Sequence, residues 1–541
     1  MSRLRVPVGK NTYDAYAGVD ADAAMVAAES AGVCIRPRVR TVTDRETGES
    51  MSVPIPCGST RETVCTPCAV KARRLRIHQC REGWHRTDAD LLPTEALVDD
   101  DDDQDHEDDR ADDVLDEQPE DQDLTDAVAC AAGLGRRVRS TRRLSGFPDL
   151  PTLPMQNRTV GREFVDERTG KAYRPSLFLT LTLPSYGKVI EGVGVPVRPD
   201  RYDYRRAALD ALLWPRLLDR FWQNLRRCAG YKVQYFSAIE AQRRLAPHLH
   251  AAVRGAIPRQ TIKAVVAATY HAAWWPALDE PTYVDRWPVY DRDTGRYVDP
   301  VTGVALPTWQ EATSDLEEPA HVVSFGKQVD VKGLLGGTPD SDRTVRYLCK
   351  YLTKNVADTY TEQHPTTHAA AAYQRHADRL HAEVLILPCS SSCANWLRYG
   401  VQPNGARPGL VPGRCSSPAH DRENLGLGGR RVLVSRQWSG KTLTEHRADR
   451  REVVAEVLAA AGITAPEADR LGADRTLPDG SPRFVWADTN PDETTYVAVI
   501  AASLRQAQTW RTQYEHAKVL AAQRSSPPVD TNSATYAAPA A

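Results

Sequence analysis

The stretch that decides the fold is Arg244-Leu-Ala-Pro-His248-Leu-His250-Ala-Ala-Val253. Its small and β-branched residues after His250 favour a β-strand. Because residues at i and i+2 of a strand point to the same face of a sheet, the imidazoles of His248 and His250 are expected to lie side by side. The pattern predicts half of a metal site, although two histidines in a half-buried strand would have the same spacing.

A second strand is predicted upstream, at Lys232–Glu240, followed by a hairpin loop at 241–247. This hairpin would return Glu240 to the side of the histidines. Two imidazoles and one carboxylate suit Mg²⁺ or Mn²⁺ with positions left open for phosphate oxygens, whereas imidazole alone suits zinc equally well. We therefore predict a divalent cation site at Glu240, His248 and His250.

Downstream lies Tyr347-Leu-Cys-Lys350-Tyr351-Leu-Thr-Lys354. The apolar spacing predicts a helix over 343–355, in which Tyr347 and Tyr351 stack at i, i+4 beside the pair Lys350 and Lys354. A phenol with a pKa of about 10 is a poor nucleophile unless cations stabilise the phenolate and a metal polarises the group under attack. The four residues are therefore candidate catalytic groups; the alternative is a helix whose tyrosines pack on the core.

Together with Leu177-Phe-Leu-Thr-Leu-Thr182, these two stretches resemble, in order and spacing, the three motifs of HUH endonucleases, the rolling-circle replication initiators of plasmids and small phages. Asn395-Trp-Leu-Arg-Tyr-Gly-Val and Gly428-Gly-Arg-Arg-Val-Leu-Val-Ser-Arg are similar to segments of the replication initiator proteins of actinobacterial plasmids and integrative elements. The likeness covers roughly residues 30 to 450, apart from an acidic insert.

The resemblance implies a site-specific, metal-dependent DNA endonuclease that starts rolling-circle replication. In that family one origin strand is cleaved, a tyrosine becomes linked to the 5′ phosphate, and the free 3′-OH primes synthesis. Tyr351 follows Lys350 directly, as the nicking tyrosine does in single-tyrosine plasmid relatives, so it is the preferred first nucleophile, with Tyr347 serving the terminating strand transfer. The expected partners are origin DNA, single-stranded at the nick, and a host helicase and polymerase.

Two other interpretations stay open from the sequence. A relaxase or HUH transposase would share the three motifs, but not the resemblance outside them. A zinc-ribbon DNA-binding regulator without catalysis would leave the grouping of Glu240, the histidines and the Tyr-Lys pairs without a purpose.

Composition favours a cytoplasmic, DNA-binding protein. The 541 residues are 41% hydrophobic, no apolar run approaches the length of a membrane span, and the sequence begins without a signal-peptide core. The formal net charge is −2, but 17 Asp and Glu lie between Asp99 and Asp126 with only Arg110. Outside that run, 68 Lys and Arg face 54 Asp and Glu, so the remainder is basic, as phosphate binding requires. The run itself predicts a disordered linker, with a DNA mimic as the alternative.

Two groups of cysteines have the spacing of zinc sites. Cysteines that lie close together in a cytosolic chain are more often zinc ligands than disulfides. The first group is Cys34, Cys57, Cys65 and Cys68, with His78, Cys80 and His85 as possible substitutes for one ligand. The second group is Cys389, Cys393, Cys415 and His420. Ligands exchanged between the two groups would be equally compatible with the sequence.

A basic segment follows the second group. Its resemblance to a phosphate-binding loop at Ser435–Thr442 is poor, because Ser435 replaces the first glycine and bulky side chains fill the loop. DNA contacts are predicted instead, through phosphates and, for the tryptophan, by base stacking. The residues are Arg430, Arg431, Arg436, Trp438 and Lys441.

The fold class predicted is α+β, with an HUH-like split β-α-β core and a central antiparallel sheet, flanked by zinc-binding modules and a helical C-terminal region. Strands are predicted at 176–183, 232–240, 248–253 and 321–331, and helices at 204–228, 259–275, 343–355, 453–461 and 496–523. The predicted domains are a zinc-ribbon-like module at 1–90, an acidic linker at 91–145, a nicking domain at 146–360 with an insertion at about 280–319, a second zinc-binding and DNA-contact region at 361–450, and a helical region with a disordered tail at 451–541.

Overall fold

The computed structural model describes residues 20–86, 144–158, 160–336, 338–350, 352–357, 359–360, 366–428, 431–460, 476–489 and 493–525. Almost all of the predicted acidic linker, most of the predicted tail, Tyr351 and Arg430 lie outside these residues. The chain divides into two compact units: one comprises the residues up to Leu75 and those from Leu443 onward, and the other runs from Arg76 to Thr442.

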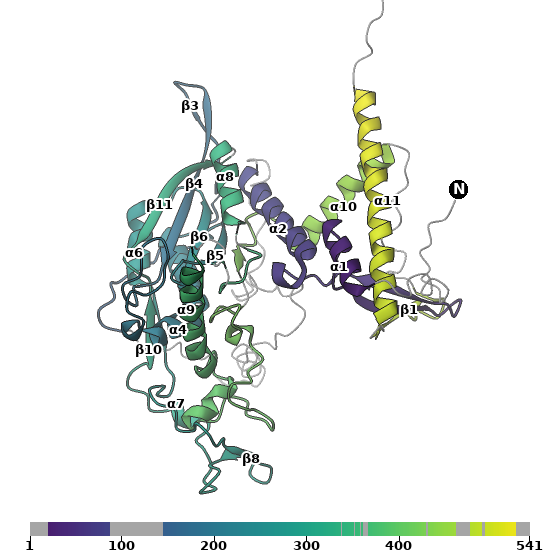
Figure 1. Cartoon of the computed structure of the whole chain (residues 1–541). Helices are drawn as coiled ribbons and strands as arrows, with labels where there is room; N and C mark the ends of the chain where they lie inside the picture. Colours follow the sequence, from purple (N-terminus) through teal and green to yellow (C-terminus); the bar gives the residue numbers. More distant parts are fainter. Residues whose placement is uncertain are drawn as a thin grey trace, which may run out of the picture. The chain divides into compact units, whose positions relative to one another are not determined.

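A six-stranded antiparallel sheet forms the centre of the second unit (Figure 1). Five strands lie in the order β11-β4-β6-β5-β12, and β3 (Phe164–Asp166) forms a hairpin with the start of β4. The strands are β4 (Lys171–Thr182), β5 (Tyr235–Ala241), β6 (Pro247–Arg254), β11 (Val329–Gly336) and β12 (Val432–Val434). All eight residues of β6 are buried, as expected for a strand with neighbours on both edges.

The two faces of this sheet carry different cores, because alternate residues of a strand point to opposite sides. Leu249, Ala251 and Val253 of β6 belong to the larger core. Ala252 belongs to a smaller core on the other face, and His248 and His250 share its strand parity. The predicted metal site therefore lies on the face of the smaller core.

Helices supply most of the larger core. Residues 204–228, predicted as one helix, form α4 (Tyr204–Leu212) and α5 (Trp214–Ala229), because Leu213 ends the first helix and Pro215 stands in the first turn of the second. The predicted apolar face of α5 is buried, and Gly230 adopts the left-handed conformation at its C-terminal cap, with a φ of 71°. The other helices of this unit are α6 (Arg259–Ala268), α7 (Trp309–Thr313), α8 (Pro339–Leu348) and α9 (Thr367–Ile386), with short 3₁₀ turns at Pro199–Arg201, Ala394–Tyr399 and Pro418–His420.

Two predicted elements are wrong in their extent. The helix expected at 259–275 ends at Ala268, and β7 (Tyr270–Ala273) follows and pairs with β10 (His321–Ser324). The single strand expected at 321–331 is divided between β10 and β11, which belong to different sheets. Gly326 lies at this break, where its amide donates to the carbonyl of Thr182 and a Cβ would collide with the backbone of Leu183.

The segment at 280–319 is more ordered than a plain surface insertion. It contains the hairpin of β8 (Val289–Asp291) and β9 (Arg296–Val298), together with α7. Tyr297 and Leu306 are buried with Leu397 in a small core of their own. The segment therefore packs on the region that carries the second cysteine group.

The first unit joins segments that are far apart in the sequence. Its sheet has the order β13-β1-β2, in which β13 (Phe484–Thr489) pairs with β1 (Arg38–Asp44), and β1 pairs with β2 (Ser50–Ile55). Its helices are α1 (Ala21–Ser30), α10 (Leu443–Ala460), α11 (Glu493–Ser525) and the first part of α2 (Glu62–His85). The two helices predicted at 453–461 and 496–523 are confirmed, but α10 begins ten residues earlier than expected.

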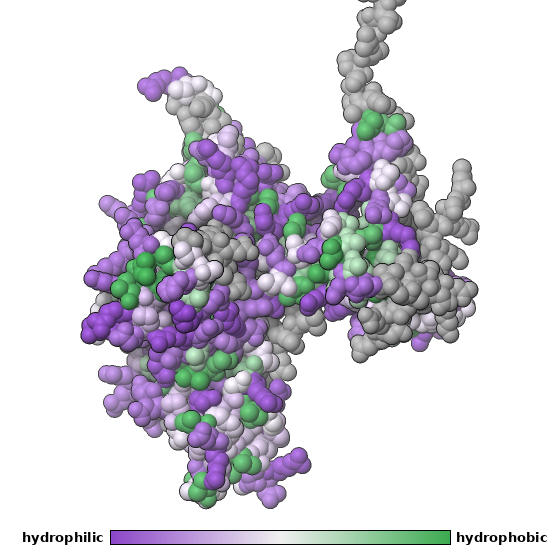
Figure 2. All heavy atoms as spheres, viewed as in Figure 1, coloured by the Kyte–Doolittle hydropathy of each residue, from purple (hydrophilic) through white to green (hydrophobic). Residues whose placement is uncertain are grey.

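The visible surface in Figure 2 is mainly hydrophilic, with hydrophobic residues in scattered small groups. Among the described helices, none combines the length and the hydropathy needed to cross a membrane.

One glycine of α2 gives a stability prediction. Gly83→Ala would ordinarily stabilise a helix interior by about 0.5–1 kcal/mol. Here the added Cβ would overlap the indole of Trp438, which is fully buried and donates through Nε1 to the carbonyl of Cys80 at 3.2 Å. We expect Gly83→Ala to lower the free energy of unfolding by about 1–3 kcal/mol, the usual cost of overpacking. Denaturant unfolding measures the change, and equal or greater stability would contradict this packing.

Candidate active site and zinc sites

The predicted hairpin is confirmed, and it places the three candidate ligands together. His248 lies opposite Glu240 of β5 and Thr182 of β4. His250 lies opposite Thr180 of β4. The turn that returns the chain is held by the amide of Gln242, which donates to the carbonyl of Ala246 at 2.8 Å.

The ligand atoms of Glu240, His248 and His250 all lie within 4.8 Å of one another. The two imidazole Nε2 atoms are 2.8 Å apart, and Nε2 of His248 is 4.0 Å from Oε2 of Glu240. All three side chains are buried, and Oε1 of Glu240 has no hydrogen-bond partner among the described residues. Two nitrogens at this distance cannot both carry a hydrogen toward each other, so at least one offers a lone pair. The donor set fits a divalent cation of the kind predicted.

Burial controls the charge of this group. It lowers the pKa of His248 to about 3 and that of His250 to about 4, so both imidazoles are neutral near pH 7. Neutral imidazole is the form that binds metals. Burial raises the pKa of Glu240 to about 7, while the charges of Arg431 and Lys350 act in the opposite direction.

The β4 motif contributes two contacts that the sequence analysis did not assign. Oγ1 of Thr180 lies 3.0 Å from Nδ1 of His250, on the side of the ring away from the other ligands. The ring of Phe178 stacks on His250, with centroids 5.5 Å apart and an interplanar angle of 16°. The alternation of 177–182 was the available signal, because it places Phe178, Thr180 and Thr182 on one face.

Among the described residues, Tyr347 has its hydroxyl at the candidate cation site. It lies in the last turn of α8, which begins with a capping box between Thr338 and Ser341. Its hydroxyl is 3.2 Å from Nε2 of His250, and the residue keeps 45% of its surface exposed. A phenol next to the candidate cation ligands and open to solvent can meet a phosphate that approaches from outside.

The helix predicted at 343–355 is too long. It ends at Leu348 with Cys349 as its cap, so Lys350 and Lys354 do not share a helical face. After the helix ends, backbone groups of this segment form hydrogen bonds with residues that are distant in sequence. Arg431 donates to the carbonyl of Lys354, and the amide of Val356 donates to the carbonyl of Glu423. Lys350 is exposed and acts electrostatically on Glu240.

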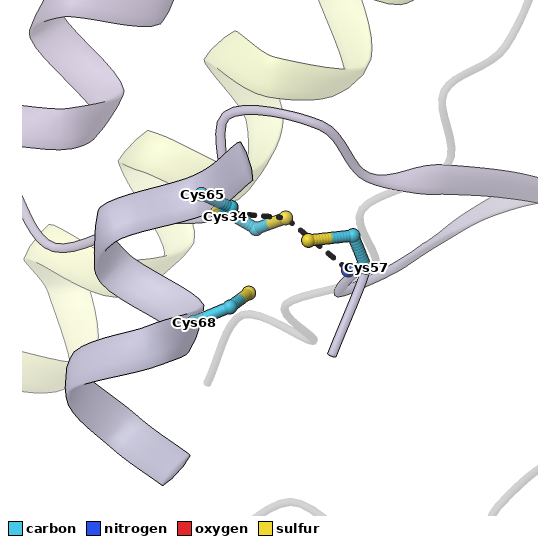
Figure 3. Close-up of side chains that lie close together, drawn as sticks. All are labelled: Cys34, Cys57, Cys65 and Cys68. Atoms are coloured by element: carbon cyan, nitrogen blue, oxygen red, sulfur yellow. Dashed lines mark hydrogen bonds between the residues drawn. The ribbon is translucent and has the colours of Figure 1, made fainter. Parts of the chain in front are cut away.

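The first cysteine group lies in the first unit. Figure 3 shows Cys65 and Cys68 on α2, with Cys34 and Cys57 reaching them from neighbouring segments. All four sulfurs lie within 4.8 Å of one another, and those of Cys34 and Cys65 are 3.8 Å apart. A hydrogen bond from Cys68 lowers the pKa of Cys34 to about 5, although burial acts in the opposite direction. The set has the composition of a closed structural zinc site, and Cys80, a suggested substitute, is instead buried in the smaller core.

The second group lies wholly in the second unit. Cys389, Cys393, Cys415 and His420 also bring their ligand atoms within 4.8 Å, so neither group needs a ligand from the other. Nε2 of His420 is 3.5 Å from the sulfur of Cys393, while its Nδ1 is 2.8 Å from the carbonyl of Val384. A ring held through Nδ1 presents Nε2 to a metal. Although burial acts against it, hydrogen bonding with Cys389 and Cys415 raises the pKa of His420 to about 10.

Comparison with known families gives one match. Residues 20–523 match the family RepSA, described as the replication initiator protein of pSAM2. The chain belongs to the RepSA family of replication initiators. No curated protein and no solved structure matches the chain.

A RepSA initiator would bind origin DNA, and the predicted basic segment meets this role only in part. Trp438 is completely buried between Trp84, Phe236 and Arg254, so the base-stacking prediction for it is wrong. The guanidinium of Arg431 donates to the carbonyls of Ile239 and Lys354, so it is used in hydrogen bonds within the protein. Arg436 and Lys441 lie toward solvent, although Lys441 pairs with Glu82 at 2.9 Å.

The cysteine groups of this RepSA protein lead to a zinc prediction. We expect purified protein to contain two zinc ions per chain, and Cys65→Ser or Cys393→Ser to remove one each. Because structural zinc contributes folding free energy, each variant should lose several kcal/mol and lower Tm by about 10 °C or more. Elemental analysis and thermal unfolding measure both effects.

Cys228→Ser is the matched control, since this single buried thiol donates only to the carbonyl of Pro151. It should keep both ions. Zinc-free native protein, or an unchanged zinc content in both ligand variants, would contradict the assignment.

Proposed function

We propose that this replication initiator nicks one strand of origin DNA through a tyrosine and a divalent cation. The observation that carries the proposal is the hydroxyl of Tyr347, 3.2 Å from an imidazole that belongs to a buried Glu-His-His group. A phenol, two neutral imidazoles and a carboxylate at one point are the components that phosphoryl transfer to a tyrosine requires. The RepSA match supports an initiator over a relaxase or a transposase.

Glu240, His248 and His250 would hold the cation, Mg²⁺ or Mn²⁺, which when bound polarises the scissile phosphate. The phenolic oxygen of Tyr347 attacks phosphorus and loses its proton. The bond from phosphorus to the 3′ oxygen breaks, and that oxygen takes up a proton as it leaves. The products are a tyrosine ester of the 5′ phosphate and a free 3′-OH.

The charges near the group support this chemistry. Lys350 and Arg431 both act on Glu240, so the site keeps positive charge beside the carboxylate for an incoming phosphate. Tyr351 remains a second candidate for strand transfer at termination. We place the nicking activity in the predicted segment 146–360, and we infer that the free 3′-OH serves a host polymerase and helicase.

Single-stranded oligonucleotides tiled across the origin of the replicating element test the proposal. Incubation with Mn²⁺ should give a covalent protein–DNA adduct that survives denaturing electrophoresis, and chelation of the cation should prevent it. Absence of an adduct with every oligonucleotide, combined with specific duplex binding, would favour a DNA-binding regulator without catalysis.

A further inference from the structure

The part of α2 that follows the first cysteine group is strongly basic. No Asp or Glu lies between Glu62 and Glu82, whereas five Lys and Arg do. Lys71 and Arg74 are exposed and Arg73 is half-buried. Residues at i and i+3 of a helix lie on the same face, so Lys71 and Arg74 form one charged edge.

Two other cations of the same unit have acidic partners. Arg40 pairs with Asp488 at 2.7 Å and Lys518 with Glu515 at 3.2 Å. By contrast, Lys71, Arg73 and Arg74 make no ion pair and no hydrogen bond within the described part of the chain. Their charge is therefore compensated by nothing that the structure describes.

The charged edge is also held in place. Cys65 has a non-helical backbone, with a φ of −160°, and Pro67 and Cys68 begin the regular helix directly after it. Cys68 and Leu75 of the same helix are buried. The helix is fixed at its start by four thiols and along its length by buried residues. Its backbone therefore loses little conformational entropy when the cations bind a ligand.

We infer that this segment of α2, residues 66–75, docks on the sugar-phosphate backbone of double-stranded origin DNA. The inference rests on the proposed function and adds to it a second DNA surface in the first unit. Duplex is favoured over single-stranded DNA because 66–75 contains no Phe, Tyr or Trp, and binding of single strands uses aromatic stacking platforms. The major groove of a duplex accepts a helix, whose edge cations then reach the phosphates.

The test uses full-length, zinc-loaded protein and a fluorescent origin duplex titrated across a range of KCl concentrations. Lys71→Ala with Arg74→Ala should weaken duplex binding about tenfold at 150 mM salt and reduce the slope of log K against log salt by about 2, since each phosphate contact contributes about 0.9. Lys71→Arg with Arg74→Lys keeps both charges and should bind as the original protein does.

The matched control is Arg40→Ala with Lys518→Ala, which removes the same charge from ion-paired positions of the same unit. Its salt slope should not change. All variants should keep two zinc ions and form the covalent adduct with a single-stranded oligonucleotide at the original rate. An unchanged slope in the α2 variant, or an equal fall in the control, would overturn the inference. If the original protein itself forms no adduct, the proposed nicking is wrong, whereas the duplex measurement remains a valid test of the α2 surface.

Discussion

Replacing both His248 and His250 by alanine is expected to abolish nicking while leaving most duplex binding intact. The two imidazoles supply two of the three ligands, and their Nε2 atoms meet at 2.8 Å. Loss of Lewis-acid assistance removes several kcal/mol of transition-state stabilisation, which corresponds to about a 10³-fold fall in rate. Adduct formation with Mg²⁺ or Mn²⁺ present measures this fall, and duplex affinity should change less than about threefold because phosphate contacts elsewhere supply it.

His376→Ala is the matched control for the double variant. His376 is buried in the same unit, bonds to Tyr204 and to the carbonyl of Arg244, and is not a member of the ligand group. It should bind metal and nick as the original protein does. If the His248→Ala, His250→Ala protein nicks DNA at the original rate, these histidines do not bind a catalytic cation.

The second large effect is expected for Tyr347→Phe, which removes only the hydroxyl that lies 3.2 Å from His250. The phenyl ring still packs edge-on against Phe178, so the fold should be retained. We expect no adduct at this position and a fall of at least about 10³-fold in nicking, because a phenyl ring offers no nucleophile. Peptide mapping of the adduct formed by the original protein identifies the linked residue.

Tyr351→Phe provides the comparison. If Tyr347 is the first nucleophile, this variant should still form the adduct and lose the later strand transfer. The sequence favoured the opposite order, with Tyr351 first. An adduct mapped to Tyr351 alone would restore that order, and an adduct at neither residue would remove this region from the active site.

The grouping of the three candidate cation ligands was predictable because all its determinants are local. A hairpin joins β5 to β6, and alternation alone places Glu240, His248 and His250 on one face. The cysteine groups were predictable for a related reason: some members of each group lie only a few residues apart, and this close spacing of thiols is typical of structural zinc sites.

Features that depend on distant partners were not predictable. The spacing of 343–355 is helical, but α8 ends at Leu348, and the carbonyl of Lys354 and the amide of Val356 bond to the distant residues Arg431 and Glu423. Trp438 lies among basic residues, which suggested a DNA contact. It packs instead edge-on against Trp84, with ring centroids 5.9 Å apart, and no local pattern indicates that pairing.

The pairing of β1 with β13 has a consequence for the order in which the protein is made. Arg40 and Asp488, which join the two strands, are 448 residues apart. At a synthesis rate of roughly 5–20 residues per second, β1 waits about 20–90 s on the ribosome before its partner strand emerges. The second unit lies entirely between them and can fold during that interval. A chain interrupted before β13 would therefore contain the complete second unit and an unfinished first unit, so the first unit can be completed only after translation has passed residue 489.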